Sequence, residues 1–239
     1  MAEFKYILGL DTAMAACSAS LFDVAGNNFA TQIHQMPRGQ AERLVPMAQD
    51  VVKEAGISFS DIDAIATTVG PGAFTGLRIG LSTARTFGLA LDIPVIGCVT
   101  TDVLAKQFFE EQDIEQEQIL AVLIETKRKD FYIRTYNADM SFNTEPQELE
   151  LGEVLKLLAS ENAVCIGDVL SRFQKAAGDN LPANITFIDG YEVPDPEVIC
   201  RLCKCYEEQG VLDKHDAEPL YLRGADTSEP KKKARVIAE

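Results

Sequence analysis

Runs of apolar and polar residues in the first 110 positions predict a regular order of strands and helices. Strands are expected at 4–10, 17–23, 29–36, 63–69 and 93–99, and helices at 41–55, 74–91 and 101–109. The helix at 41–55 repeats apolar residues with the i, i+3, i+4, i+7 spacing of one helix face. Pro46 must lie in the first turn of this helix or kink it. The first three strands follow one another without a helix, which predicts a hairpin meander.

Beyond residue 110 the apolar runs become shorter and the linkers more acidic. Strands are expected at 119–125, 131–137, 162–166 and 185–188, and helices at 151–160, 169–177 and 197–209. This order repeats the mixed order of the first half in a smaller form. We therefore predict two related α/β lobes joined near residue 110.

The predicted division of the chain has four parts. The amino-terminal lobe takes residues 1–109 and carries the glycine-rich motif, and the smaller carboxy-terminal lobe takes 110–210. A closing segment at 211–224 is expected to pack back on the body, and a basic, disordered tail is expected at 225–239.

The most informative stretch is a glycine-rich passage between a strand and a helix. The turn Gly70-Pro71-Gly72 leads from the strand into a helix in which small residues recur at every fourth position. These residues are Gly76, Gly80, Ala84 and Gly88. Glycine within a helix costs roughly 1 kcal/mol relative to alanine, so the repeats require a packing reason. The stripe predicts close approach of another helix; the alternative is packing on the chain's own sheet or on the helix at 41–55.

Candidate sites for chemistry are few. The turn at Gly70 and Gly72 invites a phosphate-binding interpretation, but the chain lacks the G-x-x-x-x-G-K-[ST] pattern, and the G-x-G-x-x-G pattern fails at Thr75. Asp11, beside Thr12 at the end of the first strand, can hold a metal ion against a phosphate chain. The alternative is an Asx turn, in which the carboxylate accepts a backbone N–H two residues on.

No other catalytic or metal-binding constellation stands out. His34 and His215 lie far apart in the chain and neither adjoins a recognisable nucleophile. The spacing Cys200-x-x-Cys203-x-Cys205 falls on a predicted helix and lacks the further ligands of a zinc site. We interpret these cysteines as structural thiols of a reducing compartment and expect no metal.

Charge and hydropathy narrow the function classes. The formal net charge of −15 argues against a chain that binds tRNA by itself, because phosphate neutralisation dominates nucleic-acid affinity. The one basic run, at 231–235, lies in the tail and is expected to be solvated. No apolar run approaches the ~20 residues that span a bilayer, and the amino terminus resembles no signal peptide. A cytoplasmic protein is expected.

Several motifs resemble the bacterial TsaB (YeaZ) family. They are Ile7–Thr12, Cys17–Leu21, Ala41–Pro46, Gly70–Gly80, Ile93–Gly97 and Glu218–Arg223. The resemblance is strong over residues 4–104, sparse over 119–210 and returns at 216–223. It implies a two-lobed fold of the actin/Hsp70/sugar-kinase (ASKHA) type, with mixed sheets flanked by helices.

The resemblance also implies a function. Members of this family are non-catalytic partners of TsaD, which transfers a threonylcarbamoyl group to tRNAs reading codons that start with A, giving N6-threonylcarbamoyladenosine (t6A). TsaE, an ATPase, completes the bacterial set. ATP and metal are then expected in the partner subunits, with no cofactor bound by this chain alone, and tRNA is contacted only indirectly. The same helices can alternatively form a homodimer.

The resemblance places the partner interface on the helices around Pro46 and at 74–91. The interface residues expected from it are Leu44, Pro46, Met47, Phe74, Leu77, Gly80, Leu81, Ala84 and Gly88. The catalytic relative holds a metal with a His-x-x-x-His pair in the region that here covers 38–44, where no histidine occurs. The turn at 126–132 matches the family's Asp-Ala-Arg-x-x-Glu-Val-Tyr turn only loosely. The rival interpretation is an independent ASKHA enzyme, either a sugar-kinase-like phosphotransferase or a peptidase.

Overall fold

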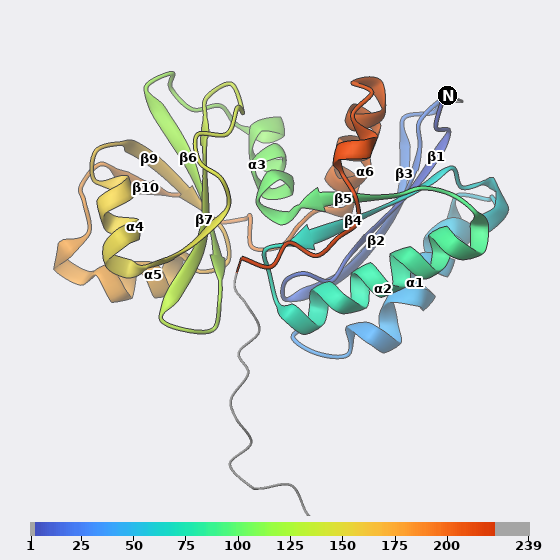
Figure 1. The fold of residues 1–239 in the computed structure, drawn as a ribbon, viewed down its shortest axis with the longest axis horizontal. Helices are drawn as coiled ribbons and strands as arrows, with labels where there is room; N and C mark the ends of the chain where they lie inside the picture. The colour runs from blue at the N-terminus through green and yellow to red at the C-terminus, as the bar shows by residue number, and fades with distance from the viewer. Residues whose placement is uncertain (1–2, 223–239) are drawn as a thin grey trace, which may run out of the picture.

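The computed structural model describes residues 3–222, which fold into two lobes with one five-stranded sheet each (Figure 1). The first sheet has the order β3-β2-β1-β4-β5. Its strands are β1 (Tyr6–Asp11), β2 (Ala16–Asp23), β3 (Asn28–Gln35), β4 (Ala64–Gly70) and β5 (Val95–Val99). The three strands β1, β2 and β3 pair antiparallel, and β4 and β5 add parallel to β1. The predicted meander is confirmed.

The second lobe repeats this topology. Its sheet has the order β10-β9-β6-β7-β8 and the same pattern of parallel and antiparallel pairs. Its strands are β6 (Gln118–Glu125), β7 (Asp130–Asn137), β8 (Gln147–Glu150), β9 (Asn162–Ile166) and β10 (Ile185–Phe187). The duplicated order confirms the prediction of two related α/β lobes, and the architecture is a two-lobed ASKHA fold.

Helices cover both faces of the first sheet. On one face lie α1 (Gln40–Glu54) and α2 (Phe74–Leu91), and on the other lies α6 (Pro196–Glu208) (Figure 1). Every residue of β4 is buried, as expected for a central strand that is covered on both sides. The helices α3 (Thr100–Glu111), α4 (Leu151–Leu158) and α5 (Leu170–Ala177) follow the predicted order.

Three details differ from the sequence expectations. Pro46 lies within α1 beyond its first turn, so the first-turn alternative is wrong. The strand β8 forms in a segment expected to be an acidic linker, because it pairs with β7 at the sheet edge. The helix α3 continues to Glu111, past the predicted lobe boundary at 109.

A larger correction concerns α6, which was expected in the second lobe at 110–210. Its apolar side chains, including Val198 and Ile199, pack with Ile7, Ala64 and Ile96 of the first sheet. Periodicity predicts the helix and its buried face, but it carries no information on which sheet that face covers. The chain returns to the first lobe before residue 196.

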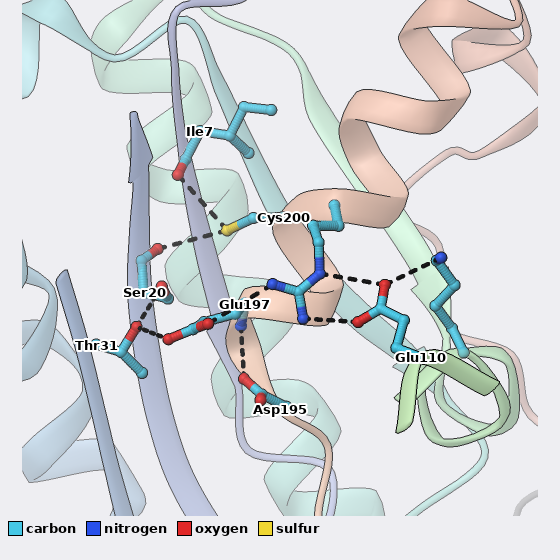
Figure 2. Close-up of polar contacts among 9 residues, drawn as sticks. Ile7, Ser20, Thr31, Glu110, Asp195, Glu197 and Cys200 are labelled. Carbon is cyan, nitrogen blue, oxygen red and sulfur yellow. Dashed lines mark hydrogen bonds and ion pairs between the residues drawn. The ribbon is translucent and has the colours of Figure 1, made fainter. Parts of the chain in front are cut away.

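Figure 2 shows the polar contacts that hold α6 against the first lobe. Glu197 accepts a hydrogen bond of 2.8 Å from the Thr31 hydroxyl of β3, and Arg201 pairs with Glu110 of α3 at 2.8 Å. The Cys200 thiol is buried and donates to the carbonyl oxygens of Ile7 and Ser20, both at 3.6 Å. The structural role predicted for this cysteine is confirmed, and residues 3–222 hold no His, Cys, Asp or Glu cluster suited to a metal ion.

The closing segment packs back on the first lobe as predicted. The Gly97 amide donates to the His215 carbonyl at 2.7 Å, and the Leu220 amide donates to the Val69 carbonyl at 2.8 Å. The expected segment 211–224 is described as far as Leu222. The tail at 225–239 and its basic run lie outside the described residues.

The two lobes also share one hydrophobic core. Ala13, Met14 and Leu77 of the first lobe belong to the same cluster as Leu120 and Ile124 of β6. Beside it, Asp102 of α3 accepts hydrogen bonds from Arg134 and Tyr136 of β7. No helix of the described residues is both long and apolar enough to cross a membrane.

Candidate functional site

The small-residue stripe of α2 packs on the chain's own first lobe: Gly76 and Gly80 face the β1–β2 turn, and Gly88 faces Val95 of β5. A Cβ atom at Gly80 would lie 2.8 Å from the Thr12 hydroxyl oxygen, and one at Gly76 would overlap the Thr12 carbonyl oxygen. The Thr12 hydroxyl also donates to the Gly76 carbonyl at 2.7 Å. The glycines are therefore explained by close packing of α2 on its own sheet, the alternative that the sequence left open.

This packing corrects most of the expected partner interface. Seven of the nine expected residues are buried within the chain, so their side chains contribute little to its surface. They are Leu44, Met47, Leu77, Gly80, Leu81, Ala84 and Gly88. The physical reason is that apolar residues recur with the same helical spacing whether the face packs on the chain's own core or on a partner. The sequence pattern therefore does not distinguish the two. Phe74 is 50% exposed and Pro46 is half-buried, so these two side chains remain accessible to a partner.

An apolar surface does remain on the outer side of α1 and α2. Among the described residues, six large hydrophobic side chains are exposed, and four lie on these helices or on the closing segment beside them. These four are Val45, Phe74, Leu89 and Tyr221. The Phe74 and Tyr221 rings lie 5.4 Å apart, the Arg78 guanidinium lies 3.9 Å from the centre of the Phe74 ring, and its Nε donates to the Tyr221 hydroxyl at 3.1 Å. The aromatic pair thus joins the start of α2 to the closing segment.

Asp11 is held in an Asx turn under the start of α2. Its Oδ1 accepts from the Ala13 amide at 3.1 Å and from the Thr68 hydroxyl at 2.5 Å, while its Oδ2 has no partner. The side chain is fully buried, and this burial raises the pKa of Asp11 from 3.8 to about 6 against the lowering effect of these hydrogen bonds. The Asx turn is confirmed, and the buried carboxyl group is not part of the lining of the cleft described below.

The burial of Asp11 predicts a specific pH dependence. Because its pKa is raised in the folded state, the ionised form costs stability, and that cost grows as pH rises from about 4 to about 6. The free energy of unfolding of Asp11→Asn, relative to the parent, should therefore increase by about 2 kcal/mol between about pH 4.5 and 7.5. Urea denaturation at both pH values measures this difference. Asp139→Asn is the control: hydrogen bonds from Ser141 lower the pKa of that exposed carboxyl, so it is already ionised in both the folded and the unfolded chain over this pH range and the difference should stay nearly constant. A pH-independent difference for Asp11→Asn would contradict the assignment.

The glycine turn serves the packing of the chain itself. Gly70 has a φ of +118°, and a Cβ there would lie 2.8 Å from the Leu220 carbonyl oxygen. A Cβ at Gly72 would lie 2.5 Å from the Ala13 carbonyl oxygen, which already accepts from the Ala73 amide at 2.7 Å. Both glycines are therefore required by neighbouring backbone, and a phosphate is not needed to explain them.

A cleft of about 990 Å³ opens between the two lobes. Its walls are the β1–β2 turn, the loop before α1, the start of α2, the β6–β7 turn, Asp168 and the end of the closing segment. Burial raises the pKa of Asp168 to about 6, although its Oδ1 accepts a hydrogen bond of 2.8 Å from the Glu125 amide. Asp11 and Thr12 lie behind the cleft wall rather than in it.

Sequence reasoning missed three of these features. Leu89 and Tyr221 lie within apolar runs, and the sequence does not mark which residue of such a run stays exposed. Asp168 follows a short strand. Its place in the fold could be predicted only by assuming that the second lobe repeats the first. The available signal for the cleft was the run of cations at 127–129, which follows directly after a predicted strand.

Comparison with known proteins places the chain in a family. The family model described as tRNA N6-adenosine threonylcarbamoyltransferase (TsaD) matches residues 24–184. The TsaB protein of Escherichia coli K12 is 29% identical over 91% of this chain and 94% of its own length. The solved structure of YeaZ from Pseudomonas aeruginosa has a TM-score of 0.75 and 25% identity, over 91% of this chain and all of that one. The chain belongs to the TsaB (YeaZ) family.

Other relatives agree with this assignment. TsaB of Haemophilus influenzae is 23% identical over 92% of this chain and 94% of its own length. A second structure from P. aeruginosa, described as similar to the peptidase YeaZ, also has a TM-score of 0.75, with 27% identity over 92% of this chain. TsaB relatives thus match nearly the whole described body, including the second lobe, where the motifs were sparse.

Proposed function

We propose that this protein is a non-catalytic subunit in t6A biosynthesis, which activates a TsaD-like threonylcarbamoyltransferase by binding it. The TsaB relatives are named as tRNA threonylcarbamoyladenosine biosynthesis proteins, and the matching family model describes the transferase itself. In this proposal a TsaE-like ATPase completes the set, ATP and metal for the reaction are held by the partner subunits, and tRNA is bound mainly by them. The site of action is the cytoplasm.

The observation that carries the proposal is the exposed apolar pair at the start of α2. Phe74 and Tyr221 lie side by side there with Arg78, and adjoining exposed apolar side chains mark an interaction site. Beside Phe74 a groove of about 500 Å³ is lined by Ala41, Thr75, Ile79 and Ser82. Aromatic and arginine side chains such as Phe74 and Arg78 are also the residue types that most often anchor protein interfaces.

The arrangement around Asp11 supports a non-catalytic role over the rival phosphotransferase. A kinase of this fold class needs a carboxylate that reaches the metal–phosphate group, whereas Asp11 is fully buried and lies outside the lining of the cleft. The absence of histidines at 38–44 removes the metal ligands that the resemblance assigns to the catalytic relative.

Co-expression tests the proposal directly. The full chain is expected to co-purify with the TsaD-like protein of the same organism, and only the mixture with the TsaE-like protein, ATP and threonylcarbamoyl donor components should form t6A on tRNA. The chain alone should neither hydrolyse ATP nor cleave peptides. Metal-dependent turnover by the purified chain, or undiminished t6A formation when it is left out, would refute the proposal.

A further inference from the structure

Residues 215–222 of the closing segment, here called the strap, join the edge of the first sheet to the start of α2. Ile96 of β5, the last strand of that sheet, forms an isolated antiparallel bridge with Asp216. Further along, the Leu220 amide donates to the Val69 carbonyl of β4 at 2.8 Å. The strap therefore covers a sheet edge that would otherwise expose unpaired backbone groups.

Two glycines of the first sheet make room for the strap. A Cβ atom at Gly97 would lie 2.5 Å from the Asp216 carbonyl oxygen, and one at Gly70 would lie 2.8 Å from the Leu220 carbonyl oxygen. Backbone can approach this closely only where no side chain intervenes. The strands β4 and β5 are thus shaped to receive the strap in its docked position.

The attachment of the strap is small. Of residues 211–222, Ala217 alone is buried, in a cluster with the buried side chains of Val69 and Leu81. Arg85 of α2 also donates a hydrogen bond to the Ala217 carbonyl. Little apolar area is buried by such a cluster, so detachment of the strap costs much less free energy than unfolding of the lobe.

The end of the strap fixes the side chains on which the proposed partner surface depends. The Tyr221 ring lies 5.4 Å from the Phe74 ring, and the Tyr221 hydroxyl accepts from Arg78 Nε at 3.1 Å. The Arg78 guanidinium in turn lies 3.9 Å from the centre of the Phe74 ring. Each of the three side chains therefore restricts the rotamers of the other two, which lowers the entropy that a partner must remove on binding.

We propose that docking of the strap assembles the partner-binding surface, with Tyr221 as a positioning residue for Phe74 and Arg78. The inference rests on the proposed function and adds a means of control to it, because detachment of the strap would turn pairing off. Coupling of this kind is reciprocal. If the docked strap raises the affinity for the TsaD-like protein, the bound partner must favour the docked strap by the same factor.

Hydrogen exchange of the full chain with a matched pair of variants tests the attachment. Ala217→Gln forces a long polar side chain into the small cluster, whereas Glu218→Gln places the same residue at the exposed next position. In Ala217→Gln the amides of Gly97 and Leu220 should exchange at least about tenfold faster, because both donate to or from the strap. Residues 118–137 of the second lobe should be unaffected, and Glu218→Gln should match the parent throughout. Unchanged exchange of these two amides in Ala217→Gln would overturn the proposal.

Calorimetric titration with the TsaD-like protein tests the coupling. Ala217→Gln should weaken pairing by about tenfold or more although Phe74 and Tyr221 are both retained, and Glu218→Gln should stay within about twofold of the parent. Addition of the partner to the parent chain should slow exchange of the Gly97 amide, which lies in a buried part of β5. Full-strength pairing by a chain whose strap has detached would refute the coupling.

Tyr221→Ala carries the test if Ala217→Gln does not fold, since Tyr221 is 43% exposed. Its effect should run through Phe74: Tyr221→Ala should weaken pairing in the parent but have little further effect in a Phe74→Ala background. Tyr221→Phe, which keeps the ring, should recover most of the loss. Additive losses from Tyr221→Ala and Phe74→Ala would overturn the positioning role. A parent chain that pairs as well as all its strap variants refutes the strap alone, whereas a parent chain that does not pair refutes the proposed function.

Discussion

Replacing Gly80 with arginine is expected to unfold this protein. Gly80 is buried where α2 crosses the sheet, and a Cβ atom there would already lie 2.8 Å from the Thr12 hydroxyl and 3.5 Å from the Thr67 hydroxyl. An arginine side chain must either displace α2 or bury an unpaired charge, and each costs several kcal/mol. Domains are stable by only about 5–15 kcal/mol, so most of the folded population should be lost.

Circular dichroism during heating and urea titration measures this effect. Ser82→Arg is the matched control, since Ser82 is exposed on the same helix and its replacement should change the free energy of unfolding by less than about 0.5 kcal/mol. If Gly80→Arg stays folded with an unchanged melting temperature and only loses pairing, the stripe would be a partner interface after all.

Phe74→Asp is expected to abolish pairing with the TsaD-like partner while leaving the fold intact. Phe74 is half exposed beside the groove on α1 and α2, so an aspartate there would place a charge in a desolvated contact and weaken pairing by about 100-fold or more. The fold should tolerate the change, because position 74 opens α2 and a negative charge at a helix start is favourable. Titration calorimetry of the two purified proteins gives the affinity, and the melting temperature of the variant checks its folding.

Phe142→Asp provides the comparison for this variant. Phe142 is 60% exposed but lies in the second lobe, away from α1 and α2, so the same substitution there should leave pairing unchanged. Equal losses from both variants would mean that pairing responds to added charge in general, and unchanged pairing with Phe74→Asp would move the interface elsewhere.

Much of the fold follows from local patterns in the sequence. The strand β9 appears at its predicted residues, and most other elements begin and end within a few residues of the prediction. Asp11 was correctly expected to have an Asx turn as one of its two roles, because that turn depends only on the next two residues. The segment 147–150 could not be predicted as a strand, since it becomes one only by pairing with β7.

The sequence by itself determined the elements, the duplicated α/β order and the glycine-rich motif that resembles TsaB. Only the tertiary structure decided which neighbour each apolar face meets. Gly76 and Gly80 of α2 face Thr12, α6 covers the first sheet instead of the second, and Phe74 of α2 lies beside Tyr221 of the closing segment. The physical reason is that helical period records which side of a helix is apolar, whereas burial depends on contacts between residues far apart in sequence.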